Sequence, residues 1–310
     1  MKKILYVLLC SLLFISCSSK DVIVTVENPS DFDRLTEIVE VPIDGIKSKL
    51  TVHDSLVYIV KNEAGEIIPS QVTYDRKIIF QAGLKAGETK SFKIETGDPQ
   101  EYQAKTYGRF ITERKDDFAW ENDKVAFRIY GPALVALDGP SNGIDIWYKR
   151  TENLVIDNWY KKDLAGEASY HNDNGEGLDD YKVGRTLGAG AMAPYVNGKL
   201  WLNENFTSEE VLDNGPLRTT FKLTYKDIDV DGKKYSENRT FSIDAGSQFS
   251  KVVQAYGISE PLTVAAGIVK RPEKDSVISS LEKGYLIYSE PNTNKAEGIY
   301  LATVFPQDIE

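Results

Sequence analysis

Apolar and polar side chains alternate with a period of two through most of this 310-residue chain. Residues 22–27, Val-Ile-Val-Thr-Val-Glu, place a valine at every second position. Successive side chains of a β-strand point to opposite faces of a sheet, so this pattern predicts strands. Similar short runs, separated by turn signals, lie at residues 38–41, 56–60, 77–80 and 91–94. We therefore expect a small antiparallel β-sandwich over residues 17–96.

Residues 96–99, Thr-Gly-Asp-Pro, form the best linker, and longer extended runs follow it. These runs lie at residues 126–130, 133–137, 144–148, 199–203 and 217–225. Asp231-Gly232 between two alternating segments is typical of a tight hairpin. Thr207 and Glu210 have the spacing of a capping box and predict one or two helical turns. We expect a large two-sheet sandwich over residues 105–310, and so an all-β chain.

The charge balance excludes some classes of partner. The chain has 37 Lys and Arg against 47 Asp and Glu, a formal charge of −10. A protein that binds duplex nucleic acid normally shows a basic patch or stripe, whereas the basic residues here are scattered. We therefore expect no nucleic-acid partner, and an anionic ligand would need a local group of Arg side chains.

Cysteine and histidine are scarce, which excludes zinc fingers and disulfide-stapled frameworks. The two Cys, Cys10 and Cys17, lie in the first seventeen residues. The two His are His53 and His171. We expect His53 to be structural or exposed, which leaves His171 as the imidazole for any chemistry that needs one.

The first residues have the pattern of an export signal. Lys2 and Lys3 precede an apolar stretch at residues 4–15, too short to span a bilayer comfortably. The sequence Phe-Ile-Ser-Cys that ends at Cys17 resembles a bacterial lipobox, and an ordinary secretory peptide is the alternative. We expect residues 1–16 to be removed and Cys17 to be lipidated. The product would be an outer-membrane lipoprotein, anchored on the periplasmic side rather than at the cell surface.

Residues 113–123 combine charges, an amide and an indole just before a predicted strand. One interpretation is a loop that presents Arg114 and Glu121 to a ligand, with Trp120 as a stacking platform. The alternative is a solvated turn beside a core Trp, because charge runs usually form exposed surfaces.

Two of the four Trp, Trp147 and Trp159, lie in residues 145–160 beside Lys149 and Arg150. Aromatic rings stack on sugar rings, and Arg binds carboxylates with two hydrogen bonds. The alternative is that alternate side chains face the core. Strand periodicity would then place Ile146 and Tyr148 on one face and Trp147 and Lys149 on the other.

Residues 170–185 form a long polar, glycine-rich loop that holds His171. Loops of this kind on a β scaffold often carry functional sites, and His serves as an acid or base near neutral pH. A surface His beside a flexible loop is the alternative. Asp173, Glu176, Asp179 and Asp180 also supply oxygen ligands, but their spacing is not that of an EF-hand. Calcium is therefore a minor alternative to a site without a cofactor.

Four segments together resemble the Bacteroidetes family known as domain of unknown function 4861: residues 113–123, 130–134, 147–150 and 170–179. The resemblance implies a galactose-mutarotase-like supersandwich behind a small β domain. It also implies an exported protein encoded near enzymes for uronic acids in polysaccharide utilisation loci. At least part of the family is associated with elimination of water from a terminal uronate of an oligosaccharide.

Elimination across C4–C5 of a uronate needs a cation on the carboxylate, a base for the C5 proton and an acid for the leaving oxygen. We expect Arg114 or Arg150 to neutralise the carboxylate, His171 to be the base, and Tyr170 or Tyr181 to be the acid. The residues expected to bind substrate are Trp120, Glu121, Asn122, Trp147, Lys149, Trp159, Asn172, Asp173 and Glu176. The alternative function is a non-catalytic lipoprotein that binds carbohydrate with the same aromatic and Arg side chains.

Overall fold

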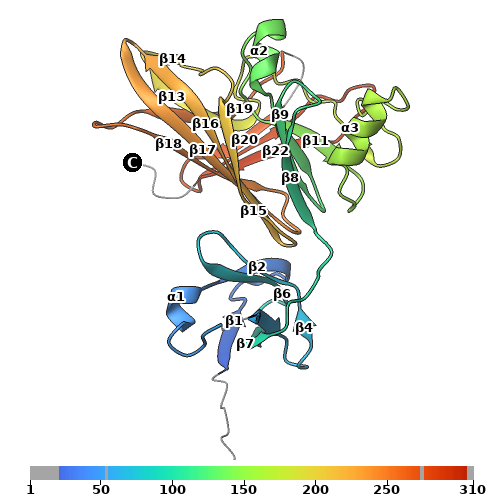
Figure 1. Cartoon of the computed structure of the whole chain (residues 1–310). Coiled ribbons are helices and arrows are strands. Elements are labelled where there is room, and N and C mark those ends of the chain that lie inside the picture. Colours follow the sequence, from blue (N-terminus) through green and yellow to red (C-terminus); the bar gives the residue numbers. More distant parts are fainter. Residues whose placement is uncertain (1–20, 53–54, 273–275, 306–310) are drawn as a thin grey trace, which may run out of the picture.

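The computed structural model describes residues 21–52, 55–272 and 276–305. Residues 1–16, Cys17 and His53 lie outside the described residues. The predicted all-β architecture is confirmed, with a small β-sandwich at the N-terminus followed by a larger β structure (Figure 1). Within the described residues, no helix has the length and apolar character needed to cross a membrane.

The first part is two small antiparallel sheets that pack face to face. One sheet has the order β1-β7-β3-β4 and the other β2-β6-β5. Ile78, Phe80 and Ile94 are completely buried between them. The strands are β1 (Val22–Glu27), β2 (Arg34–Pro42), β3 (Val57–Lys61), β4 (Ile67–Ile68), β5 (Ser70–Val72), β6 (Lys77–Leu84) and β7 (Thr89–Gly97), and α1 is the single turn Ile43–Ile46.

The centre of the second part is an antiparallel sheet of order β12-β11-β10-β9-β8. Its strands are β8 (Thr106–Ile111), β9 (Asp117–Asn122), β10 (Ala126–Ile129), β11 (Asp145–Lys149) and β12 (Gly177–Leu178). A four-stranded sheet covers one face, made of β15 (Ser208–Asn214), β16 (Arg218–Val230), β17 (Lys233–Asp244) and β18 (Ser250–Tyr256). Phe118, Trp120, Phe221 and Phe241 form the core between these two sheets.

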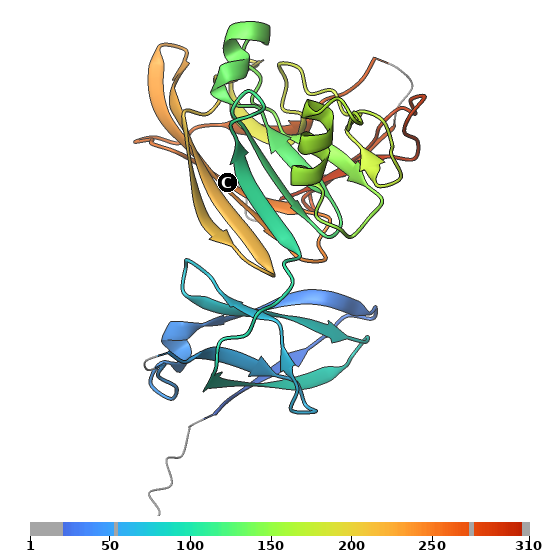
Figure 2. The ribbon, with the colours of Figure 1, turned by 45° about the vertical axis from the view of Figure 1, so that its right-hand side comes forward.

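The other face of the central sheet carries helix α3 (Ile156–Leu164) and the loop around Tyr170 (Figure 2). Trp147 points to this face and Ile146 to the opposite one, as strand alternation predicts. Two three-stranded sheets complete the second part. They contain β13 (Ala189–Val196), β14 (Lys199–Leu200) and β19 (Val264–Ile268), and β20 (Ser276–Ser280), β21 (Tyr285–Ser289) and β22 (Tyr300–Val304).

The hairpin at Asp231-Gly232 is confirmed. Strands β16 and β17 pair as far as Val230 and Lys233, and two residues connect them. Asp231 has φ 55° and Gly232 has φ 83°. Positive φ at both central residues matches the right-handed twist of the strands, which is why Asp-Gly is favoured here.

Two local predictions were wrong. Residues 133–137 are not extended but lie in helix α2 (Pro132–Asp138), where Pro132 begins the helix with a suitable φ and no lost hydrogen bond. Residues 207–210 do not begin a helix, because 208–214 is strand β15 and pairs with β16. A capping-box spacing reflects only neighbouring residues. In the folded protein, the pairing of the edge strand β15 with β16 outweighs it.

The two parts of the chain are joined by specific contacts. The Gln71 side chain donates to the carbonyl of Arg218 (2.9 Å) and accepts from the backbone N–H groups of Leu217 (3.0 Å) and Arg218 (2.9 Å). Ile79 of the first part packs against Leu217 and Ala245 of the second, and all three are buried. The first part therefore supports the end of the long β16–β17 hairpin.

Candidate active site

A buried arginine is the centre of the candidate site. Arg128 on β10 is opposite Asp145 on β11 in the strand register, on the face covered by α3. Arg128 Nε donates to Asp145 Oδ2 at 2.9 Å, and Arg128 Nη2 donates to Asp179 Oδ2 at 2.8 Å. The side chains of all three residues are almost completely buried. The sheet register thus fixes Arg128 beside Asp145, and the residue after β12, Asp179, binds the same guanidinium.

The cluster has more carboxylates than cations, and this excess affects the protonation of its carboxyl groups. Burial and the neighbouring Asp145 together raise the pKa of Asp179 to about 7, against the lowering effect of Arg128. Asp117 lies 4.0 Å from Arg128, and burial raises its pKa to about 6. A buried charge is costly unless it is paired, so this cluster can hold or release protons near neutral pH.

His171 lies at the exposed edge of this cluster. Its Nδ1 is 3.1 Å from the backbone oxygen of Asp179 and 3.4 Å from Asp179 Oδ2. The His171 side chain is 47% exposed, whereas that of Asp179 is 2% exposed. Because a carbonyl oxygen only accepts hydrogen bonds, Nδ1 of a neutral ring must carry the proton and Nε2 the free electron pair. No hydrogen bond to Nε2 is formed within the described residues.

Two cations lie close to His171. The Arg114 guanidinium is 5.8 Å from the centre of the Tyr170 ring, which packs against the His171 ring at 4.4 Å between centroids. Within the described part of the chain, the Arg114 side chain forms no hydrogen bond or ion pair. Lys295 Nζ donates to the backbone oxygen of His171 at 2.8 Å. An anionic ligand would find favourable charge on this surface.

The backbone around Arg114 is held by a close contact. Lys115 and Asp116 have positive φ values of 52° and 59°. Gly131 packs against this turn so tightly that a Cβ there would lie 1.6 Å from the Asp116 oxygen. Asp117 also accepts the backbone N–H of Gly131 at 2.9 Å. The turn that carries Arg114 is therefore fixed to the start of α2.

Several residues predicted to bind substrate are instead part of the protein interior. Trp120, Glu121, Asn122 and Trp147 are completely buried, as is the side chain of Lys149. Trp120 packs on Phe221 and Phe241, so its faces are not open to a sugar. These roles are corrected: one face of the central sheet is covered by β15–β18 and the other by α3 and its loop, so side chains on both faces are buried.

The buried polar members of this group have structural partners. Glu121 Oε2 binds Lys149 Nζ at 2.7 Å, and its carboxylate accepts the backbone N–H groups of Val155 and Ile156 at the start of α3. The Asn122 side chain donates to the backbone oxygens of Asp244 and Ser247. These contacts connect the central sheet to α3 and to β17.

The two tyrosines predicted as acids are also buried. The Tyr170 hydroxyl accepts a hydrogen bond from Arg128 Nη1 at 3.2 Å, and burial raises the pKa of Tyr170. Tyr181 belongs to a separate cluster with Val183, Tyr288 and Leu301. Because both side chains are buried, neither hydroxyl is open to a substrate, and their assignment as the acid is corrected.

The remaining predicted residues line the outer edge of the loop. Asp173 accepts the backbone N–H of Gly175 and Gly177 and pairs with Arg150 at 2.9 Å. Trp159 donates weakly to Glu176 at 3.3 Å. Trp159, Asn172 and Glu176 border a small hollow with Tyr170. Arg150 is thus a rim residue held by Asp173, whereas Arg114 lies over the Tyr170 ring that packs against His171.

The acidic residues of the loop have different partners. Asp179 binds Arg128, Asp180 accepts from Thr293 at 2.5 Å, and Asp173 closes the turn at Gly175. Among the described residues, no group of three or more His, Cys, Asp or Glu is arranged to hold a metal ion.

Four residues of the cluster were not predicted from the sequence as site residues: Arg128, Asp145, Asp117 and Lys295. Asp179 was predicted only as an oxygen ligand for calcium. Arg128 and Asp145 lie in strands between strongly apolar residues, which indicates that both are buried. Charged side chains in buried strands usually need partners. That signal was present in the sequence. Lys295 gives no such signal, because only the tertiary fold brings it to residue 171.

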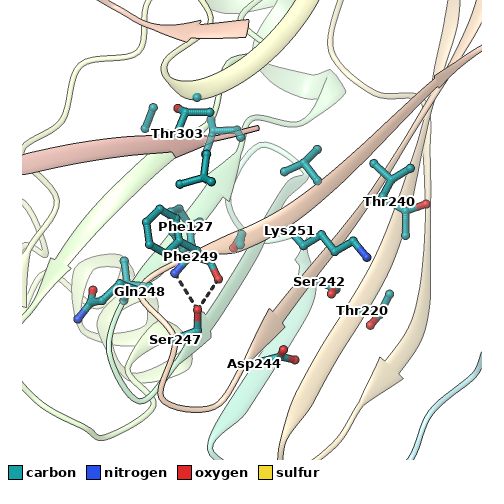
Figure 3. A pocket seen from close by; sticks show the side chains of 18 of the residues that line it. Phe127, Thr220, Thr240, Ser242, Asp244, Ser247, Gln248, Phe249, Lys251 and Thr303 are labelled. Atoms are coloured by element: carbon teal, nitrogen blue, oxygen red, sulfur yellow. Dashed lines mark hydrogen bonds between the residues drawn. The ribbon is translucent and has the colours of Figure 1, made fainter. Parts of the chain in front are cut away.

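A large cavity lies elsewhere in the molecule. It measures about 800 Å³ and is lined mainly by strands of the second part, among them β16, β17, β18 and β22, with Glu40, Tyr74, Asp75 and Lys77 of the first part at its border. Figure 3 shows Thr220, Thr240, Ser242 and Lys251 along one side and Phe249 with Phe127 along another. None of the predicted site residues lines it. The His171 cluster and this cavity are two separate places where a ligand could be tested.

Comparisons with known proteins give the following relatives. A family model described as Domain of unknown function (DUF4861) matches residues 26–310, as the four sequence segments predicted. The chain is 33% identical over 331 residues to "Uncharacterized protein P7" of Formosa agariphila, which covers 98% of this chain and 81% of the relative. A solved structure described as a protein in the glycosyl hydrolase family 38 from Enterococcus faecalis has 9% identity and a TM-score of 0.46. That match covers 87% of this chain, which spans 38% of the solved structure.

Proposed function

The chain belongs to the family described as Domain of unknown function (DUF4861), and we propose that it eliminates water from the terminal uronic acid of an oligosaccharide. His171 is the proposed base, and Arg114 is the proposed partner of the uronate carboxylate. The proposed active site is the exposed edge of the Arg128 cluster.

The observation that carries the proposal is the orientation of the His171 ring. Nδ1 is bound to the Asp179 backbone at 3.1 Å, and the ring is half exposed. Nε2 therefore offers an electron pair outward, on a ring whose position is fixed. Arg114 contacts the same Tyr170 ring as His171, so a cation and a base are arranged around one aromatic support.

The proposed step balances with one imidazole. Nε2 of His171 takes the C5 proton, the C5–H electron pair forms the C4–C5 double bond, and the C4–O bond breaks. The imidazolium then returns this proton to the departing oxygen, which leaves as water. Arg114 neutralises the carboxylate next to C5, which makes the C5 proton more acidic. No second acid is required, consistent with the burial of Tyr170 and Tyr181.

A non-catalytic carbohydrate-binding protein is the rival function. Such a protein would hold sugars on open aromatic faces. Trp120 and Trp147 are completely buried, Trp159 is 6% exposed, and Trp201 is half-buried with Lys199 over its ring at 4.1 Å. These Trp rings are therefore not open platforms for sugars, which removes the aromatic support that the sequence offered for the binding protein.

Export and lipidation belong to the same proposal. We propose that residues 1–16 are a signal peptide and that Cys17 is lipidated, which anchors the protein to the outer membrane on its periplasmic side. The proposed elimination needs no cofactor. Turnover that is unchanged by a metal chelator would agree with this, and loss of turnover would indicate a calcium ion.

The test uses oligosaccharides that end in a uronic acid and follows ultraviolet absorbance, because the product has a double bond conjugated to its carboxylate. Wild-type protein should raise the absorbance, and His171→Ala should abolish the increase with an unchanged circular dichroism spectrum. Lys251→Ala is the matched control, since Lys251 lies in the large cavity and away from His171.

The outcomes separate the alternatives. Loss of turnover in the Lys251 variant with full turnover in the His171 variant would place the chemistry in the large cavity. Binding of the oligosaccharide without any absorbance change, across a panel of uronates, would support the binding protein.

A further inference from the structure

We propose that Asp179 is a positioning residue that fixes the ring orientation and the tautomer of His171, and that Arg128 holds Asp179 in place. The role of Asp179 in turnover rests on the function proposed above, whereas the effect of Asp179 on the imidazole can be measured on the protein without substrate. Asp179 does not reach the substrate, because it lies behind the His171 ring.

Asp179 contacts the loop of His171 at three points. Its backbone N–H donates to the Tyr170 oxygen at 2.9 Å, which closes the base of the loop. Its backbone oxygen and its Oδ2 lie 3.1 Å and 3.4 Å from His171 Nδ1. One residue therefore joins both ends of the loop and places two acceptor oxygens near Nδ1 of the ring.

The rest of the loop is rigid for local reasons. Gly177, with φ 112°, approaches β11 so closely that a Cβ would lie 2.0 Å from the Tyr148 oxygen. Asn174 donates to the backbone oxygens of Ser169 (3.0 Å) and Asn172 (2.9 Å). A loop fixed at its base by the sheet can hold an imidazole in one orientation, which a mobile surface loop could not.

Arg128 keeps the Asp179 carboxylate facing the ring. Its Nη2 binds Asp179 Oδ2 at 2.8 Å, the same oxygen that faces His171 Nδ1, and its Nε is held by Asp145. The carboxylate oxygen is thus shared between the guanidinium and the imidazole. Carboxylate–histidine pairs of this kind fix the ring and stabilise the imidazolium that forms during proton transfer.

Other groups around His171 do not offer the same contact. Arg114 and Lys295 are cations and donate rather than accept. The Tyr170 ring packs against the imidazole, and its hydroxyl is turned to Arg128. The carboxylates of Asp145 and Asp117 pair with Arg128 instead. Among the described residues, the acceptors for Nδ1 belong to Asp179.

The first test needs no variant at the site. In ¹⁵N-labelled protein with His53→Gln, one imidazole remains, and its ¹⁵N shifts report which nitrogen carries the proton. The neutral ring should have its proton on Nδ1. A majority of the Nε2–H tautomer, as in free histidine, would overturn the proposal.

The second test compares Asp179→Asn with Asp227→Asn, a control on an exposed stretch of β16 outside the loop. Asp179→Asn keeps the backbone oxygen that accepts from Nδ1, so the Nδ1–H tautomer should persist, whereas loss of the carboxylate should lower kcat roughly 10- to 100-fold with little change in KM. Asp227→Asn should change neither the tautomer nor kcat. A wild-type kcat in Asp179→Asn would contradict the role of the carboxylate, even if that variant is less stable.

The two proposals can fail separately. An Nδ1–H tautomer in a protein that is inert on every uronate would leave the positioning role intact and remove the proposed reaction. Turnover with an Nε2–H tautomer would keep the reaction and remove the role of Asp179.

Discussion

At the scale of single residues, the candidate site depends on carboxylates that the sheet buries around one cation. Asp179 is 2% exposed and shares Arg128 with Asp145. Burial penalises the charged form of a carboxyl group, and here it outweighs the attraction to Arg128. The fold therefore makes Asp179 sensitive to pH in a range where an ordinary Asp is fully ionised.

The sign of this effect can be predicted. The pKa of Asp179 is raised from 3.8 to about 7 in the folded protein, so the folded state binds more protons than the unfolded state between these values. The contribution of Asp179 to stability should then fall as pH rises from about 4 to about 7, by a few kcal/mol. We expect the stability of wild type relative to Asp179→Asn, from urea unfolding at each pH, to decrease over this window.

Asp173→Asn is the control for that measurement. The backbone N–H groups of Gly175 and Gly177 lower the pKa of Asp173, so its contribution is lost as pH falls below about 4. A wild-type advantage over Asp179→Asn that grows from pH 4 to pH 7 would contradict the account.

The single exposed imidazole also predicts stereochemistry. If His171 both removes the C5 proton and protonates the leaving oxygen, the two groups must lie on the same face of the sugar. Glucuronic acid has this arrangement, and iduronic and galacturonic acids do not. We expect turnover of terminal glucuronate and little or none of the other two, measured by product absorbance. A preference for iduronate or galacturonate would mean that a second group, such as Lys295, provides the proton.

At the scale of elements, helix α3 depends on a carboxylate from the sheet beneath it. Glu121 on β9 accepts the N–H groups of Val155 and Ile156, which a helix leaves without internal partners at its start. The negative charge is also favourable at this end of a helix. The same carboxylate pairs with Lys149, which is completely buried.

Glu121→Ala should therefore destabilise the protein by about 3–5 kcal/mol, because it leaves the Lys149 charge buried without a partner. Urea unfolding measures the change. The exposed pair of Arg109 and Glu113 provides the comparison, since Glu113→Ala should cost no more than about 1 kcal/mol. Similar costs for the two variants would mean that Lys149 finds water or another acceptor.

The elements also show which predictions the sequence could support. Strand periodicity predicted the β class and the Asp231-Gly232 hairpin, because these depend on neighbouring residues. Helix α3 was missed because the carboxylate that accepts the N–H of Val155 at its start belongs to Glu121, which lies 34 residues earlier in the chain. Trp120 and Glu121 attracted a functional interpretation because they are unusual residues in a charged segment. Their burial follows from the β15–β18 sheet on one face and α3 on the other, and sequence alone does not specify this packing.

At the scale of the whole molecule, the N-terminal sandwich supports the end of the β16–β17 hairpin. Arg218 joins Glu40 of the first part to Asp244 of the second, and Leu217 is buried against Ile79. We expect the two parts to unfold together because these contacts cross between them.

Leu217→Ala should cost about 2–5 kcal/mol and separate the unfolding of the two parts. Calorimetry should show one transition for wild type and a broader or divided one for the variant. Val211→Ala on the exposed side of β15 should leave the single transition almost unchanged. A sharp single transition in both variants would show that the interface does not couple the two parts.

The central claim is that the His171 cluster is where a terminal uronate loses water. The most direct measurement is the mass of a uronate-ended oligosaccharide after incubation with wild-type protein and with His171→Ala. The account predicts a product lighter by one water for wild type and unchanged mass for the variant. Unchanged mass with wild type, fragments from hydrolysis, or equal conversion by His171→Ala would contradict it.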